Sequence, residues 1–177
     1  MIEYIALLRG INVGGNNIIR MSALKAFFET MGFSNVRTYI QSGNVLFASD
    51  EKDLNKLTKS IEDGLSKTFD YEANLVLITK PHLEKIVVNA PKGFGSEPTL
   101  FRYDVIFLKP PLTVDEAVKH MPVKEGVDML AKGENVVYFS RLISKATQSR
   151  LNKIIGSPIY KYLTIRNWNT TKKLTTL

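Results

Sequence analysis

The sequence of 177 residues contains no cysteine. This absence excludes disulfide bonds, thiolate metal sites, iron–sulfur clusters and cysteine nucleophiles. No apolar run approaches the roughly 20 residues that a membrane-spanning helix needs, and no basic region precedes the apolar N-terminus as it would in a signal peptide. We therefore expect a cytoplasmic protein with no membrane partner.

Acidic residues are missing from the last quarter of the chain. Eight Lys and Arg follow Glu134 with no Asp or Glu among them, whereas the preceding residues carry 16 Lys and Arg against 17 Asp and Glu. The net charge of +7 therefore arises in the final quarter, where it should create a positive surface potential. A solubilising face explains this pattern, and so does an anionic partner such as nucleic acid or a phosphorylated ligand.

The hydrophobic pattern predicts the same order of elements twice: strand, helix, strand, strand, helix, strand. The predicted strands are residues 4–8, 36–40, 45–48, 75–78, 101–108, 127–131, 135–139 and 162–166. The predicted helices are residues 22–31, 50–69, 81–88, 114–121 and 144–155, followed by a short tail helix after Asn169. Ser144 and Gly156 are the expected N-cap and end of the helix over 144–155.

This order predicts an α+β fold of two tandem ferredoxin-like (βαββαβ) modules with antiparallel sheets and a short C-terminal helix. The first module with its connecting helix takes residues 1–88, and the second takes residues 100–177. Residues 89–99 are rich in Pro and Gly and form the natural linker. The uncovered face of each sheet is expected to pack on the other module, bind a partner or drive homodimerisation.

A Gly/Asn-rich loop after residues 4–8 and a Gln-Ser-Gly-Asn turn after residues 36–40 are predicted to lie at the same edge of the first sheet. Glycine-rich turns before a helix bind anions through oriented N–H groups, and arginine adds charge-assisted donors. An ordinary tight loop also favours Gly and Asn, because both tolerate positive φ. The predicted ligand-binding residues are Arg9, Asn12, Gly14, Gly15, Asn16, Gln41, Ser42 and Asn44.

No set of residues identifies a catalyst or a cofactor. The glycines fit neither a dinucleotide fingerprint nor a Walker A loop, and Ser42 lacks an evident base. His82 and His120 have no partner at metal-ligand spacing, so no metal site is predicted. Whether the protein is an enzyme stays open.

Three stretches resemble the bacterial domain of unknown function 1697 family: residues 9–15, residues 36–45 and residues 164–170. They read Arg9-Gly10-Ile11-Asn12-Val13-Gly14-Gly15, Val36-Arg37-Thr38-Tyr39-Ile40-Gln41-Ser42-Gly43-Asn44-Val45 and Thr164-Ile165-Arg166-Asn167-Trp168-Asn169-Thr170. The resemblance implies an α+β fold in a bacterial cytoplasmic protein and assigns no catalytic residue. It suggests that the loop and the turn belong to one site. Ser144-Lys145 is similar to the start of a helix in that family.

The favoured function is binding of a small anionic or phosphorylated ligand at the loop and the turn. A second patch is predicted to close this site or to form another, and it contains Ser144, Lys145, Arg166, Asn167, Trp168 and Asn169. One alternative is a nucleic-acid-binding module that uses the basic C-terminal quarter. The other is a dimerisation or interaction module built on an open sheet face.

Overall fold

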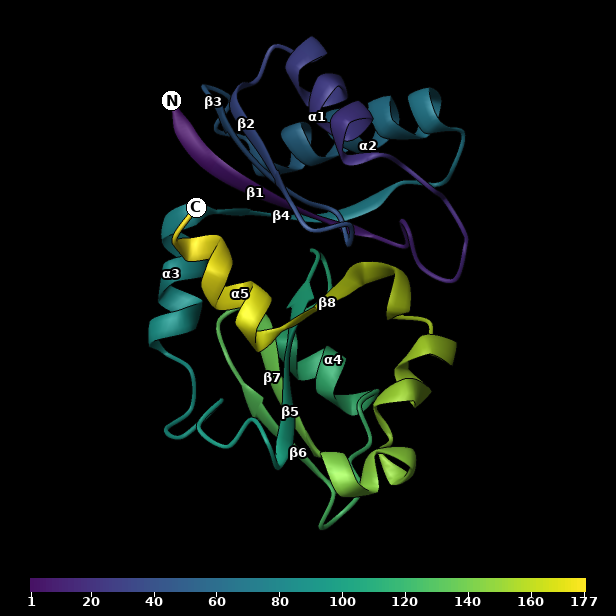
Figure 1. Cartoon of the computed structure of the whole chain (residues 1–177), viewed down its shortest axis with the longest axis vertical. Helices are drawn as coiled ribbons and strands as arrows, with labels where there is room; N and C mark the ends of the chain where they lie inside the picture. The colour runs from purple at the N-terminus through teal and green to yellow at the C-terminus, as the bar shows by residue number, and fades with distance from the viewer. The chain divides into compact units, whose positions relative to one another are not determined.

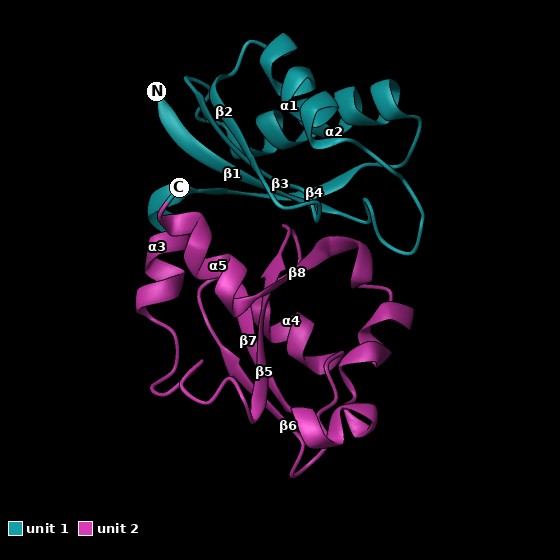
Figure 2. Cartoon of the chain, viewed as in Figure 1, with its two compact units in different colours: residues 1–82, 177 teal, residues 83–176 magenta.

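The computed structural model describes residues 1–177 and contains two four-stranded antiparallel sheets with helices, which confirms the α+β class (Figure 1). The chain divides into two compact units, residues 1–82 with residue 177, and residues 83–176 (Figure 2). None of the helices has the length and hydropathy that crossing a membrane requires.

The first unit is built on a sheet with the strand order β2-β3-β1-β4. Every neighbouring pair in this sheet is antiparallel. Two helices, α1 and α2, lie on one of its faces (Figure 1). The elements are β1 (Ile2–Arg9), α1 (Met21–Thr30), β2 (Ser34–Tyr39), β3 (Asn44–Ser49), α2 (Leu54–Phe69) and β4 (Asn74–Thr79).

Helix α2 illustrates how the sequence forms these elements. Leu57, Ile61 and Leu65 recur every four residues and are all buried in the core against the sheet. The carboxylate of Asp53 accepts hydrogen bonds from the backbone N–H groups of Asn55 and Lys56 and caps the first turn. The helix therefore begins at Leu54 rather than near residue 50.

The other face of the first sheet is apolar as well. Ile5, Leu7, Leu46 and Val76 alternate with the residues that pack on α1 and α2, and at most 5% of each is exposed.

The second unit repeats the sheet topology with the order β6-β7-β5-β8. Its strands are β5 (Phe101–Leu108), β6 (Asp128–Lys132), β7 (Val136–Leu142) and β8 (Leu163–Asn167). The helices around them are α3 (Lys80–Val88), α4 (Val114–Lys119) and α5 (Trp168–Thr175), with 3₁₀ helices at η1 (Ile143–Gln148), η2 (Leu151–Gly156) and η3 (Tyr160–Tyr162).

The single helix predicted over residues 144–155 is wrong, because the structure has two 3₁₀ helices there, η1 and η2. The buried carboxylate of Asp128 accepts the backbone N–H of Arg150 at 2.9 Å, which holds the chain at the break between them. Leu151 and Ile154 pack on the core at a spacing of three residues, as a 3₁₀ helix requires. Ser144 is not a cap, since the residue before η1 is Leu142.

Residues 91–99 pack within the second unit through Phe94. The ring centroid of Phe94 lies 4.9 Å from that of Tyr103, 5.3 Å from that of Tyr138 and 5.1 Å from that of Trp168. The hydroxyl of Tyr138 also donates to the carbonyl of Ile86 in α3. This segment thus packs against the face of the second sheet that carries Tyr103 and Tyr138.

Candidate functional site

The Gly/Asn-rich loop and the Gln41–Asn44 turn meet at one end of the first sheet. The side-chain Nδ2 of Asn12 donates to the carbonyl of Gln41 at 2.9 Å. The backbone N–H of Leu8 donates to the carbonyl of Gly43 at 2.8 Å. These two bonds join the end of β1 to the turn between β2 and β3.

The amide side chains at this junction are used to hold the chain together. Asn12 exchanges two hydrogen bonds with the backbone of Ile19, and Asn17 donates to the carbonyl of Gly10. Asn44 is completely buried and donates to Tyr39 O at 2.9 Å and to Ser42 Oγ at 3.1 Å. The amides of Asn12 and Asn44 therefore fix the loop and the turn through hydrogen bonds to the chain.

The other predicted residues of this site differ in exposure. Gly14, Gly15, Asn16 and Gln41 are exposed, whereas Arg9 and Ser42 are half-buried.

Gly43 is required by packing between the loop and the turn. Its φ is +81°, and a Cβ built there would lie 2.7 Å from Ile11 Cδ1 and 2.9 Å from Leu8 Cβ. The Gly in the Gln-Ser-Gly-Asn motif thus has a structural explanation that needs no ligand.

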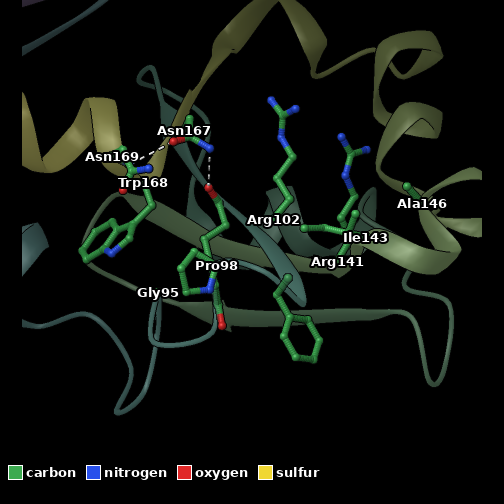
Figure 3. A pocket seen from close by; sticks show the side chains of 11 residues that line it. Gly95, Pro98, Arg102, Arg141, Ile143, Ala146, Asn167, Trp168 and Asn169 are labelled. Carbon is green, nitrogen blue, oxygen red and sulfur yellow. Dashed lines mark hydrogen bonds between the residues drawn. The ribbon is translucent and has the colours of Figure 1, made fainter.

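A cavity of about 370 Å³ opens at one end of the second sheet (Figure 3). Strand β8 pairs with β5 only from Asp104 to Leu108, so the first residues of β5 have no strand beside them on that side. The cavity occupies this edge, where the chain turns from β8 into α5. Its lining residues are Gly95, Pro98, Phe101, Arg102, Tyr103, Arg141, Ile143, Ala146, Asn167, Trp168 and Asn169.

Two arginines of this cavity face each other across neighbouring strands. Arg102 of β5 and Arg141 of β7 are directly opposite in register, and Figure 3 shows both side chains extending to the same side of the sheet. Like charges at opposed positions destabilise a sheet. The Nε atom of Arg141 is buried and makes no hydrogen bond, while the side chain of Arg102 is 53% exposed.

Asp104 lies beneath these cations with 3% of its side chain exposed. Arg102 Nε donates to its two carboxylate oxygens at 3.2 and 3.4 Å. Burial raises the pKa of Asp104, and the guanidinium groups of Arg102 and Arg141 oppose that rise. The residues that line the cavity include Arg102 and Arg141 and no Asp or Glu.

The N-terminal turn of α5 forms another wall of the cavity. The Asn167 side chain accepts the backbone N–H of Asn169 at 2.9 Å and donates to the carbonyl of Tyr103 at 3.3 Å, so it caps the helix and ties it to β5. Trp168 is 7% exposed, and Gly95 lies so close to its indole ring that a Cβ would overlap it. Asn169 is exposed, beside the positive end of the helix dipole.

The structure brings together half of the predicted second patch. Asn167, Trp168 and Asn169 line the cavity, whereas Ser144 and Lys145 are exposed and do not.

Arg166 is buried on the other face of the sheet from Asn167. It donates to Thr164 Oγ1 at 2.8 Å and to Ile165 O at 2.9 Å. Burial lowers its pKa to about 10. Because Arg166 is buried, its guanidinium group does not contribute to the basic surface of the C-terminal quarter.

Sequence reasoning missed Arg102, Arg141 and Asp104. The available signal was the pair Arg102 and Asp104 inside an otherwise apolar strand, where charged side chains are costly unless they are paired or functional. Nothing in the sequence sets Arg141 apart from the other basic residues of the C-terminal quarter. No group of three or more His, Asp or Glu side chains is arranged to hold a metal ion.

Comparison with known proteins gives a matching family and a similar solved structure. A family model described as protein of unknown function (DUF1697) matches residues 1–138. The chain belongs to this family. The match confirms the resemblance seen in the loop and the turn, and it ends before the block at residues 164–170.

A solved structure of a conserved bacterial protein from Streptococcus pneumoniae is similar to this chain at 26% sequence identity. The alignment covers 99% of this chain and 97% of that one, with a TM-score of 0.85. The two chains therefore share their fold along their full lengths. No curated protein matches the sequence.

Proposed function

We propose that the protein binds a small anionic ligand, bearing a phosphate or a carboxylate, in the cavity between β5, β7 and the start of α5. The observation that carries this proposal is the direct opposition of Arg102 and Arg141 in a cavity with no acidic residue in its lining. An anion between the two guanidinium groups would offset their mutual repulsion.

The surrounding residues suit this role. Asp104 engages the Nε of Arg102, which leaves the terminal nitrogens of that guanidinium to receive an anion in a bidentate manner. Asn169 adds an exposed amide at the N-terminal turn of α5, where the helix dipole favours negative charge. Two cations, one amide and a helix terminus thus converge on the same cavity.

The sole tryptophan of the chain provides the assay, because Trp168 lines the cavity. Its fluorescence is followed during a titration with inorganic phosphate at constant ionic strength. We expect saturable binding in the wild type and a loss of about tenfold or more in affinity for Arg102→Gln and for Arg141→Gln, since each removes a charged hydrogen-bonding partner.

Lys153→Gln is the matched control. It removes one positive charge from the same unit at an exposed position outside the cavity, so phosphate affinity should stay within twofold. Arg102→Lys keeps the charge but removes the planar fork and should bind more weakly than the wild type. An equal loss in Lys153→Gln, or no saturable binding by the wild type, would overturn the proposal.

The loop and the turn of the first unit are a second proposed anion site. There the exposed Gly14, Gly15, Asn16 and Gln41 would meet the ligand, with Arg9 beside them, while Asn12, Ser42 and Asn44 would hold the backbone in place. The hydrogen bond from Asn12 to the carbonyl of Gln41 supports this arrangement. Calorimetric titration with phosphate tests it, since Gln41→Ala should remove a second binding event that Arg102→Gln leaves intact.

Nucleic acid is the competing partner. Labelled RNA and DNA oligonucleotides titrated at two salt concentrations separate the two proposals. Binding that falls steeply with salt and disappears in Lys145→Glu and Arg150→Glu would assign the function to the basic C-terminal quarter. Binding of phosphate with no oligonucleotide binding at low salt supports the cavity.

We also infer that each unit is a ferredoxin-like module. The support is the strand order, in which the first and third strands of each unit are central and every neighbour is antiparallel. In this topology the loop after the first strand and the turn between the second and third strands come to one end of the sheet. This arrangement agrees with the contact between Asn12 and Gln41.

A further inference from the structure

We infer that the ligand of the proposed anion site carries an aromatic ring beside its anionic group. This inference rests on the proposed function and names the class of ligand more closely. The observation behind it is a second cavity, of about 410 Å³, that shares two lining residues with the first, Phe101 and Tyr103. Each cavity lies in the range of volumes that small-molecule sites occupy.

The second cavity differs from the first in its chemistry. Most of its walls are aromatic or aliphatic, and it lies between residues 91–97 and the strands β5, β6 and β7. Its apolar walls include Phe94, Phe101, Tyr103, Met129, Leu130 and Tyr138.

The aromatic side chains of this region already form a cluster of tilted and edge-to-face rings against which another ring can pack. The centroids of Phe101 and Tyr103 lie 6.1 Å apart, and Phe94 meets Tyr103 edge to face. Tyr103 and Tyr138 are buried, whereas Phe101 is half-buried and retains an accessible surface. Met129 is 54% exposed at the same cavity, and its thioether suits contact with an aromatic ring.

The alternation of β5 places the two chemistries close together. Phe101 and Tyr103 point to one face of the strand and Arg102 points to the other. Because no strand covers this part of β5 on the β8 side, the first cavity reaches both faces and touches all three residues. A ligand there can place its anionic group on Arg102 and Arg141 and its ring against Phe101.

The test compares two probes of equal charge, methyl phosphate and phenyl phosphate, by calorimetric titration. Phenyl phosphate should bind the wild type about tenfold more tightly, because ring packing and apolar burial add to the same ionic contacts. Phe101→Leu keeps apolar volume but removes the ring and should reduce that ratio to about threefold or less. Phe101→Ala should reduce it further.

Arg102→Gln separates the contribution of the ring to affinity from that of the anionic group. It should weaken both probes by a similar factor and leave their ratio near tenfold. Equal binding of methyl phosphate and phenyl phosphate by the wild type would overturn this inference while leaving the anion site in place. Failure of both probes to bind would overturn the proposed function itself.

A third probe, AMP, shows whether the ring of the ligand is a nucleotide base or a single aryl ring. Tighter binding of AMP than of phenyl phosphate would assign the ring to a nucleotide, and the reverse order would assign it to a single-ring aryl anion. Either order, combined with the loss of preference in Phe101→Leu, supports the inference. Adenosine lacks the phosphate, and its binding as tightly as AMP would count against the role of the arginines.

Discussion

Replacing Gly43 by alanine should destabilise the first unit more than replacing Gly10 by alanine, although both glycines have positive φ, +81° and +72°. The added Cβ at residue 43 would lie 2.7 Å from Ile11 Cδ1 and 2.9 Å from Leu8 Cβ, whereas residue 10 has no atom within 4 Å. The two variants therefore share the backbone strain and differ in steric overlap.

The expected magnitudes follow from these distances. A left-handed backbone with a Cβ costs about 1–2 kcal/mol, and overpacking adds about 1–3 kcal/mol. Gly10→Ala should thus lower the free energy of unfolding by about 1–2 kcal/mol, and Gly43→Ala by about 2–5 kcal/mol. Ile11 Cδ1 is the end of a flexible side chain but Leu8 Cβ is not, so movement of Ile11 alone cannot remove the overlap.

The assay is urea-induced unfolding followed by far-UV circular dichroism. Adding Ile11→Val to Gly43→Ala removes the nearest atom, and part of the loss should be recovered relative to the sum of the single variants. The recovery is partial because the Leu8 contact remains. Equal destabilisation by Gly43→Ala and Gly10→Ala, within about 0.3 kcal/mol, would refute the close packing of the loop against the turn.

Three further variants test other parts of the structure. Gly95→Ala should lower the melting temperature much more than Gly93→Ala does. A Cβ at residue 95 overlaps the indole of Trp168, whereas a Cβ at residue 93 meets only Ser96 Oγ at 3.7 Å. The fluorescence emission of Trp168 reports the displaced ring. Asn12→Ala should lower the free energy of unfolding by about 1–3 kcal/mol in a thermal melt, since it removes the side-chain hydrogen bonds to Ile19 and Gln41. Asn16 is exposed, and Asn16→Ala should change the free energy of unfolding by less than about 0.5 kcal/mol. Asp104→Asn should tighten phosphate binding at pH 7, because it removes the carboxylate beneath Arg102 and Arg141. Burial raises the pKa of Asp104, so its stabilising contribution is present below the unfolded pKa and is lost as pH rises through the folded pKa. The free energy of unfolding of the wild type, measured in urea, should therefore rise relative to that of Asp104→Asn as pH falls.

Local hydrophobic pattern determined most of the elements of this protein. The strand predicted over residues 101–108 has the bounds that the structure gives to β5, because a short apolar run is bounded by turn residues on both sides. Helix α2 followed from its four-residue spacing, and only its first turn depended on a side chain, the cap at Asp53. The Gly/Asn-rich loop and the turn were identified as neighbours because the direction of successive strands follows from their order.

Elements that depend on long-range partners were not predictable in this way. Residues 143–156 form two 3₁₀ helices because the buried carboxylate of Asp128, more than twenty residues earlier in the chain, binds the backbone N–H of Arg150. The roles of Asn12 and Asn44 depend on the same kind of contact, since their amides donate to backbone carbonyls elsewhere in the fold. Sequence alone indicates a polar side chain and does not show which group it meets.

The candidate site shows most clearly the difference between what local sequence predicts and what long-range contacts decide. The sequence predicts an α+β chain with a polar block at residues 166–169, and three of those residues line the cavity. Arg102 and Arg141 are 39 positions apart in the chain, and their direct opposition on β5 and β7 is visible only in the folded protein. Strand register brings them together, and register depends on which face of each strand is buried against the rest of the fold.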